Sequence, residues 1–392
     1  MSENNATETR MQLIRRNALD AFNSLEMPNL RYGLGIYVDL ALVNLDEVLK
    51  ENNVFDRIKI EADLRVKIIN FPSMDKEFLE KYFDKLAKAD ENKILALHYS
   101  VLNDAVALVI PKNTNIEKPI IIYSNLSSKS KAESIIVIAE EASKASIIEV
   151  SESGINSNYK SQIVQVYAGE NSELNYYSLQ NLNDKVYNFS TKRGEVKQDA
   201  KINWIDLLLG SKFTQLKLKT NLLERGASTK KLGAFFGNNN QQFDINVESV
   251  HSKGNTQSSM NHRGVLNDSA KSIFRGTVNI AKNSASSVGH QRADILLMGE
   301  NAKCDAVPIL DVENDEVICS HGVTVGQLDP EQIFYLLSRG LDESLAKQML
   351  IAGFLDPIAR DINHEEIRNK FSNIINEKLK SEKLIEVQNV NN

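Results

Sequence analysis

The chain has 392 residues, 42% of them hydrophobic and 25% charged, which is enough for a sizeable core in two or three domains or in one long repetitive domain. Its formal net charge of −6 argues against a general nucleic-acid-binding protein, because such a protein needs a basic face to neutralise phosphates. Two cysteines, no secretory leader and no run of about 18 apolar residues predict a soluble cytoplasmic protein with neither a disulfide framework nor a membrane partner.

Residues 1–95 are predicted to form a mostly helical N-terminal region. An amphipathic helix is expected over residues 75–88, with Ser73 as its N-cap. The alternating pattern of residues 58–71 predicts a short strand between the helices. The apolar stripe of the helix consists of Leu79, Tyr82, Phe83 and Leu86.

Residues 96–328 change to short β-branched runs that are bounded by polar turns. Only three prolines interrupt this region, which suits a long succession of strands, because proline cannot donate to a ladder. The clearest strand candidates are residues 119–123, 134–138, 147–150 and 163–167.

A polar four-residue turn recurs in this β region. Its third residue falls at positions 143, 172, 200, 227, 270, 285 and 302, so the successive differences are 29, 28, 27, 43, 15 and 17. A repeat of roughly 20–30 residues made of strands and tight turns predicts a coiled β-solenoid. A conventional β-sandwich is the alternative, since polar turns recur in any all-β protein.

Residues 329–392 are predicted to form a C-terminal helical region. Asp329 is placed as an N-cap, and Gly340 closes the first helix. Asp342 and Asn363 are expected to start the second and third helices. The simplest role of these helices is to cover the open end of the solenoid.

Few residues of the chain could carry chemistry. No Cys-x-x-Cys pair, His-Glu-x-x-His motif or phosphate-binding P-loop occurs, so neither a self-contained zinc site nor nucleotide binding is expected. Cys319 and His321 would project from one face of a strand and could bind a soft metal. Two ligands are too few for a stable cluster, and a buried cysteine beside a hydrogen-bonded histidine is the structural alternative. Cys304 is interpreted as a small core residue and His290 as a structural histidine.

A carbohydrate-cleaving enzyme is a remote alternative, because some β-solenoids have that activity. Such an enzyme needs clustered carboxylates in an exposed groove. The absence of a secretory leader counts against a polysaccharide substrate. The available aspartates are Asp244, Asp268, Asp294, Asp305 and Asp311.

A series of short segments stands out between residues 251 and 357. They are Asn261–Leu266, Phe274–Gly276, Gln291 before Leu296-Leu297, Pro308–Leu310, Cys319–Gly322 with Thr324, Gly326–Asp329, Phe334–Leu336 and Ser338–Gly340. In this order, over roughly a hundred residues, these segments resemble the SufB/SufD family of SUF iron–sulfur cluster assembly components, whereas the N-terminal third matches only loosely.

The resemblance implies a right-handed parallel β-helix flanked by helical regions. It also implies a non-catalytic scaffold that pairs with a SufB-like subunit, or with itself as a homodimer, and that docks a SufC-like ATPase. The chain reads His321-Gly322-Val323 where SufB-like chains typically read His-Glu-Ala, so it is most similar to SufD. A SufB-like or homodimeric scaffold that holds the cluster itself is the runner-up.

The resemblance further implies two sites. His321, with Cys319 beside it, would support cluster assembly at the partner interface and could contribute metal ligands shared with the partner. No cluster would be bound stably by the chain alone, and a transient one would form between the subunits. The ATPase would dock on the C-terminal helices, at Asp329, Phe334, Tyr335, Arg339 and Gly340.

Overall fold

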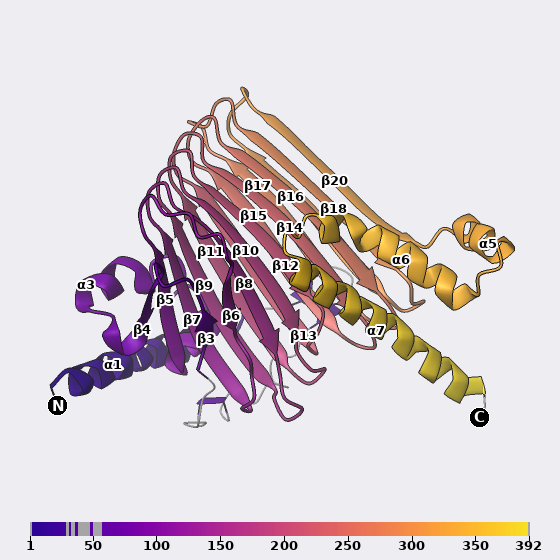
Figure 1. The fold of residues 1–392 in the computed structure, drawn as a ribbon, viewed down its shortest axis with the longest axis horizontal. Helices are drawn as coiled ribbons and strands as arrows, with labels where there is room; N and C mark the ends of the chain where they lie inside the picture. The colour runs from indigo at the N-terminus through magenta and orange to yellow at the C-terminus, as the bar shows by residue number, and fades with distance from the viewer. Residues whose placement is uncertain (1, 29–30, 33–35, 38–47, 50–56, 391–392) are drawn as a thin grey trace.

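The fold is a mainly β solenoid preceded and followed in the chain by helices, as expected (Figure 1). The computed structural model describes residues 2–28, 31–32, 36–37, 48–49 and 57–390. Within them, two nine-stranded sheets face each other, and from β5 onward successive strands alternate between the sheets. We name them by their last strands. The β20 sheet contains β3 (Lys59–Glu61), β6 (Ile120–Tyr123), β8 (Lys144–Glu152), β10 (Glu173–Asn181), β12 (Lys201–Leu208), β14 (Ser228–Gly237), β16 (Gln257–Leu266), β18 (Val288–Leu297) and β20 (Ile318–Gln327).

The β19 sheet is built in the same way on the opposite side. All pairings from β5 to β20 are parallel and connect a strand to the next but one along the chain, so each turn of the solenoid contributes one strand to each sheet. This arrangement excludes the sandwich. The β19 sheet contains β4 (Lys67–Asn70), β5 (Asp104–Ile110), β7 (Ser130–Ala139), β9 (Tyr159–Ala168), β11 (Tyr187–Val196), β13 (Phe213–Leu222), β15 (Gln242–His251), β17 (Lys271–Ile280) and β19 (Lys303–Val312).

The recurring polar turns form the corners of the solenoid. Ala142, Asn171 and Asp199 adopt positive φ angles of 55°, 57° and 52° at one corner. The N–H of each donates to a carbonyl of the next turn, for example from Ala142 to Glu170 O at 2.8 Å, so the corners stack. The turn at residues 268–271 lies at the other corner, which explains the half-length intervals of 15 and 17.

The N-terminal region differs in detail from the prediction. Two short strands, β3 and β4, pair antiparallel with β6 and β5, where one strand was expected. The helix expected over 75–88 ends at Phe83, because the Gln165 side chain donates to Phe83 O and accepts from the Leu86 N–H. Asp75 caps this helix by accepting from the Phe78 N–H at 2.7 Å, so the Ser73 cap was wrong. The elements are α1 (Ser2–Ser24), β1 (Arg31–Tyr32), β2 (Ile36–Tyr37), η2 (Phe71–Ser73), α3 (Lys76–Phe78), η3 (Leu79–Phe83) and α4 (Lys93–Ser100).

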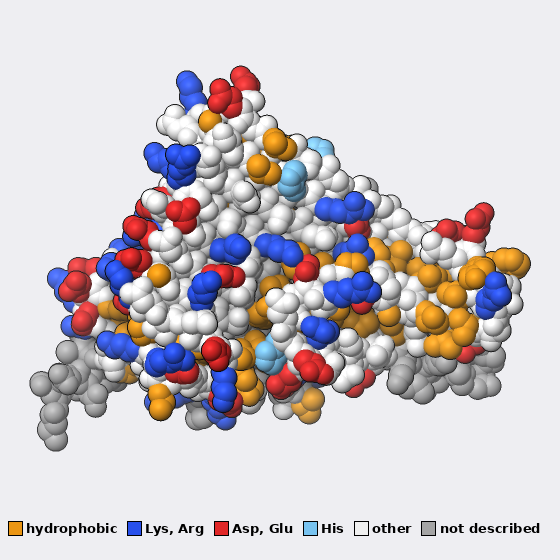
Figure 2. Space-filling view, turned by 45° about the horizontal axis from the view of Figure 1, so that its top comes forward, with side chains coloured by type: hydrophobic (Ala, Val, Ile, Leu, Met, Phe, Trp, Pro, Cys, Tyr) orange, Lys and Arg blue, Asp and Glu red, His pale blue; other side chains and the backbone are white. Residues whose placement is uncertain are grey.

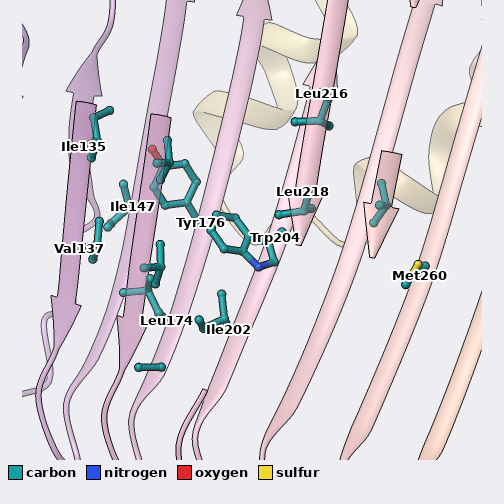
Figure 3. Packing of buried hydrophobic residues seen from close by; sticks show 14 of the residues in the cluster. Ile135, Val137, Ile147, Leu174, Tyr176, Ile202, Trp204, Leu216, Leu218 and Met260 are labelled. Atoms are coloured by element: carbon teal, nitrogen blue, oxygen red, sulfur yellow. The ribbon is translucent and has the colours of Figure 1, made fainter. Parts of the chain in front are cut away.

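The interior of the solenoid is apolar along most of its length (Figure 3). Aliphatic side chains from the facing sheets interdigitate, and Tyr176 packs against Trp204 with ring centroids 5.4 Å apart. Each turn is too short to bury its own inner face, so stacking makes the core continuous. A shift of any strand by one residue would turn its apolar side chains out of this core, so the core maintains the register of the strands.

Charged side chains also lie inside the solenoid. Lys131 and Lys160 form ion pairs with Glu133 at 2.8 and 3.2 Å, and Lys192 pairs with Asp206 at 2.5 Å. Lys231 is fully buried as well, but it donates to the hydroxyl of Ser249 and forms no ion pair within the described residues. The sequence had indicated none of these internal charges.

The C-terminal helices cover a face of the solenoid and not its end. Asp329 and Asp342 cap α5 (Pro330–Ser338) and α6 (Glu343–Arg360) as expected. α7 (Glu365–Val390) begins slightly later than predicted. α6 and α7 pack on the outer face of the β20 sheet, which is apolar there, so the expected end cap was wrong (Figure 1). No helix in the described ranges is long and apolar enough to cross a bilayer.

Candidate functional site

The last turn of the solenoid is open. β19 and β20 pair only with β17 and β18, so their other edges have no partner strand within the described residues. None of the twenty residues in these two strands is buried. Such an edge presents a row of unpaired N–H and C=O groups that can accept a strand from another chain.

Cys319 and His321 lie on this open turn. Cys319 and Val323 pack against the interior cluster. His321 stands between them, and because side chains alternate along a strand it leaves β20 on the same inner face. This confirms the expected shared face. Cys319 is half-buried and His321 is exposed.

The surroundings of both thiols disfavour the thiolate. Burial raises the pKa of Cys319, although the Gly289 N–H opposes the shift by hydrogen bonding to the sulfur. Burial raises the pKa of Cys304 to about 11, and the Ser272 hydroxyl lies 3.1 Å from its sulfur. Since the thiolate is the metal ligand, a nearby cation or metal would favour metal binding by Cys319. Cys304 packs against the interior cluster, as a small core residue would.

His290 lies on the opposite face of the same pair of strands. Its Nδ1 is hydrogen-bonded to the Ser320 hydroxyl at 2.6 Å, and Ser320 is the register partner of His290 on β20. This contact agrees with the interpretation of His290 as a structural histidine. His290 is therefore a useful comparison for His321, because the two lie on neighbouring strands but project from opposite faces of the sheet.

The open turn does not hold a complete metal site by itself. Across the part of the chain that the structure describes, no three His, Cys, Asp or Glu side chains come close enough to hold a metal ion. Cys319 and His321 therefore offer at most two ligands, a thiol and an imidazole. A complete site at this end would take its remaining ligands from a second molecule.

The predicted docking residues gather on and around α5. None of the residues in α5 is buried, and the side chains of Phe334 and Tyr335 are 72% and 57% exposed. The Arg339 guanidinium lies 5.1 Å from the centroid of the Tyr335 ring, and Gly340 closes the helix with a φ of 91°. Figure 2 shows the apolar surface that α5 and α6 present at this end; its large exposed members are Phe334, Tyr335, Leu337, Leu345 and Met349.

The acidic residues bear on the carbohydrate-cleaving alternative, because such an enzyme needs paired carboxylates. Asp244 forms an ion pair with Arg275, and Asp294 forms one with Arg292. A surface groove of about 550 Å³ lies beside η3, but none of the five aspartates proposed earlier lines it. Lysines line it together with glutamates, and Glu141 pairs with Lys112. The structure therefore adds no support for a paired-carboxylate site.

Gln291 is a site residue to which the sequence gave no role. It is the register partner of His321 on the neighbouring strand β18, and its side chain is almost fully buried. Only the register of two distant strands brings these side chains together. Its place among the segments that resemble the SufB/SufD family was the signal that could have marked it.

Comparisons with known proteins identify the family of the chain. Residues 122–354 match the family model for the SufBD core domain of SUF system FeS cluster assembly, and residues 36–122 match the SufBD protein N-terminal region. An iron–sulfur cluster assembly SufBD family protein of Staphylococcus aureus (strain MRSA252) is 28% identical over 316 residues, which cover 78% of this chain and 68% of the relative. A SufBD family protein of Staphylococcus haemolyticus (strain JCSC1435) matches with the same identity and coverage. The chain therefore belongs to the SufBD family of SUF iron–sulfur cluster assembly proteins.

Proposed function

We propose that this protein is a SufD-type, non-catalytic scaffold subunit whose open turn pairs with the β-helix of a second family member. The observation that carries the proposal is the unpaired last turn, which presents Cys319 and His321 together. A nascent iron–sulfur cluster would be cargo at that junction, bound by ligands from both subunits. A SufC-like ATPase would dock on α5 and its surroundings.

The edge itself supports pairing with a strand of another subunit. β19 and β20 are ten residues long, and such edges are normally shortened, charged or covered. Here they carry exposed apolar side chains, and the covering helices pack elsewhere. These side chains are Val307, Ile309, Val312, Ile318 and Val325.

The ligand chemistry supports a shared cluster in preference to one held by this chain. Burial raises the pKa of the Cys319 thiol, and the segment after His321 reads Gly322-Val323, without the acidic residue of SufB-like chains. The partner would supply the missing ligands and the positive charge that ionises the thiol. A SufB-like or homodimeric scaffold is the second candidate, and anaerobic reconstitution of the isolated chain distinguishes it by a stoichiometric cluster.

His321→Ala is expected to lower the iron and acid-labile sulfide of the assembled complex by about 10- to 100-fold, the range found when a metal site loses a supporting group. The measurement is metal and sulfide analysis of the complex purified anaerobically. His290→Ala is the matched control, because His290 lies on the neighbouring strand β18 and contacts Ser320 of β20, but on the outer face. A His321→Ala complex with the normal cluster content would contradict the proposed role.

Phe334→Glu is expected to weaken ATPase binding by about 30-fold or more, because an exposed aromatic anchor is a typical binding hot spot. The affinity can be measured by titrating the ATPase into the full-length chain. Deleting residues 329–392 is a poorer test, since it would also remove Leu355 and Phe371 from the outer face of the β20 sheet. The control is Ile155→Glu, at a position that is 78% exposed and far from α5 in the sequence. Equal weakening of ATPase binding by both variants would contradict docking on α5.

A further inference from the structure

The two strands of the open turn present different residues to the open edge. In a parallel sheet, alternate residues of a strand point their N–H and C=O groups to one neighbouring strand and the residues between them to the other. The Ile318 N–H donates to Ser287 O beside β18, and the Lys303 N–H donates to Ala270 O beside β17, so these residues and every second one after them face inward. The remaining residues face the open edge: Cys319, His321, Val323, Val325 and Gln327 on β20, and Cys304, Ala306, Pro308, Leu310 and Val312 on β19.

The edge of β20 is continuous and unprotected. Each of its five edge-facing residues has both a backbone N–H and a C=O. Proteins normally protect an exposed edge with charged side chains or proline, and the sequence of β20 contains no Lys, Arg, Asp, Glu or Pro. On its outer face, a Cβ added to Gly322 or Gly326 would meet no atom within 4 Å, so no neighbouring atoms crowd the strand there.

The edge of β19 is interrupted and charged. Pro308 is the third of its five edge-facing residues and has no N–H, which the fold tolerates because this position donates to no strand of the described chain. A ladder along β19 would therefore break in the middle, with two edge-facing residues on each side. Lys303, Asp305 and Asp311 add the charges that typically guard an edge.

We propose that the strand of the second family member adds to β20, and that β19 is covered without a continuous ladder. This inference rests on the proposed function of the open turn and names the strand that makes the junction. The occupant is an extended edge strand, because only an extended backbone matches the spacing of the five edge-facing residues. The ladder would include the backbone of Cys319 and His321, and would thereby set the partner's ligands in register with them.

The test places one proline on each edge. Val325→Pro removes an edge-facing N–H from β20, and it is expected to weaken binding about tenfold relative to Val325→Ala, because the partner loses a donor for its acceptor. Ala306→Pro makes the same change on β19 and is expected to alter binding by less than about threefold. Titration with a SufB-like subunit measures the heteromeric complex, and sedimentation measures self-association, since either complex would use the same edge.

Neither proline removes a hydrogen bond within the chain, because both positions face the open edge. Slow exchange of the Ser320 and Thr324 amides, which face β18, reports that β20 remains paired in Val325→Pro. The Val307 amide faces β17 and reports the same for β19 in Ala306→Pro.

Equal weakening by the two prolines would overturn the inference, as would a Val325→Pro protein that binds as well as Val325→Ala. Either result leaves the proposed function intact, provided that the wild-type complex protects the open turn from exchange. If complex formation leaves the exchange of both β19 and β20 unchanged, the proposed function itself falls, and the inference falls with it.

Discussion

Lys231→Met is expected to raise the free energy of unfolding by about 3–5 kcal/mol at neutral pH. Lys231 is fully buried, and its one hydrogen-bond partner among the described residues is the Ser249 hydroxyl. Burial lowers the pKa of Lys231 from 10.5 to about 7, against a smaller opposing effect of Glu248. Methionine has a similar length and carries no charge to desolvate, so it removes the penalty and keeps the packing.

The pH dependence of stability follows from the same lysine. Between pH 7 and pH 10.5 the unfolded chain keeps the Lys231 proton whereas the folded chain releases it, so folding weakens as the pH falls through this window. Below about pH 7 both states bind the proton and the penalty is constant. The advantage of Lys231→Met should therefore be largest at pH 7 and below, and should vanish near pH 10.5.

Denaturant unfolding of both proteins between pH 6 and pH 10 measures this effect. The control is Lys219→Met, which removes a partly exposed lysine paired with Glu248 at 3.0 Å. A surface pair of this kind contributes about 1 kcal/mol or less. A Lys231→Met protein that is less stable than wild type at pH 7 would show that the ammonium has a compensating partner.

Glu133→Gln is expected to lower the free energy of unfolding by about 3–5 kcal/mol, the opposite sign. Glu133 is fully buried and ion-paired with both Lys131 and Lys160. Burial by itself would raise the pKa of Glu133, but the two lysines more than offset it and hold the pKa far below its ordinary value. Glutamine keeps the shape and leaves two buried ammonium groups without their counter-ion.

The contribution of Glu133 is present above its unfolded pKa of about 4.5 and is lost as the pH falls below it. Wild type should therefore lose stability in acid more steeply than Glu133→Gln. Glu248→Gln, at the surface pair with Lys219, is the control and should cost about 1 kcal/mol or less. Equal unfolding midpoints for Glu133→Gln and wild type would show that the buried pairs contribute no net stability.

The repeated turns and strands could be predicted because their causes are local. Ala142 and Asn171 take positive φ at a corner that a polar, small-residue turn indicates in the sequence. The strand at residues 120–123 is a β-branched run between turns and forms as expected. The caps at Asp329 and Asp342 follow from the same kind of local signal.

The internal charges could not be predicted because their cause is tertiary. In β7, Ile135 and Ile136 point to opposite faces and both are buried, since helices cover the outer face of this strand. The alternation of side chains along the sequence therefore does not reveal which face of β7 lies inside the solenoid. Lys131 and Glu133 project from the same face of β7 as Ile135, and only the folded structure shows that this face is the interior one.

The candidate site was predictable in part. The i, i+2 spacing of Cys319 and His321 correctly places both side chains on one face of β20. The open turn was not predictable, because where the last helices pack depends on the apolar outer face of strands far earlier in the chain. The pairing of Gln291 with His321 likewise depends on a register between strands thirty residues apart.

The central claim is that β19 and β20 are covered by another subunit in the assembled complex. Hydrogen–deuterium exchange of their backbone amides, compared between the isolated chain and the complex with SufB- and SufC-like components, tests it most directly. The account predicts fast exchange of the β19 and β20 amides that point to the open edge in the isolated chain and strong protection of them in the complex, with little change in inner strands such as β11 and β13. Equal exchange of β19 and β20 in the two states would contradict it.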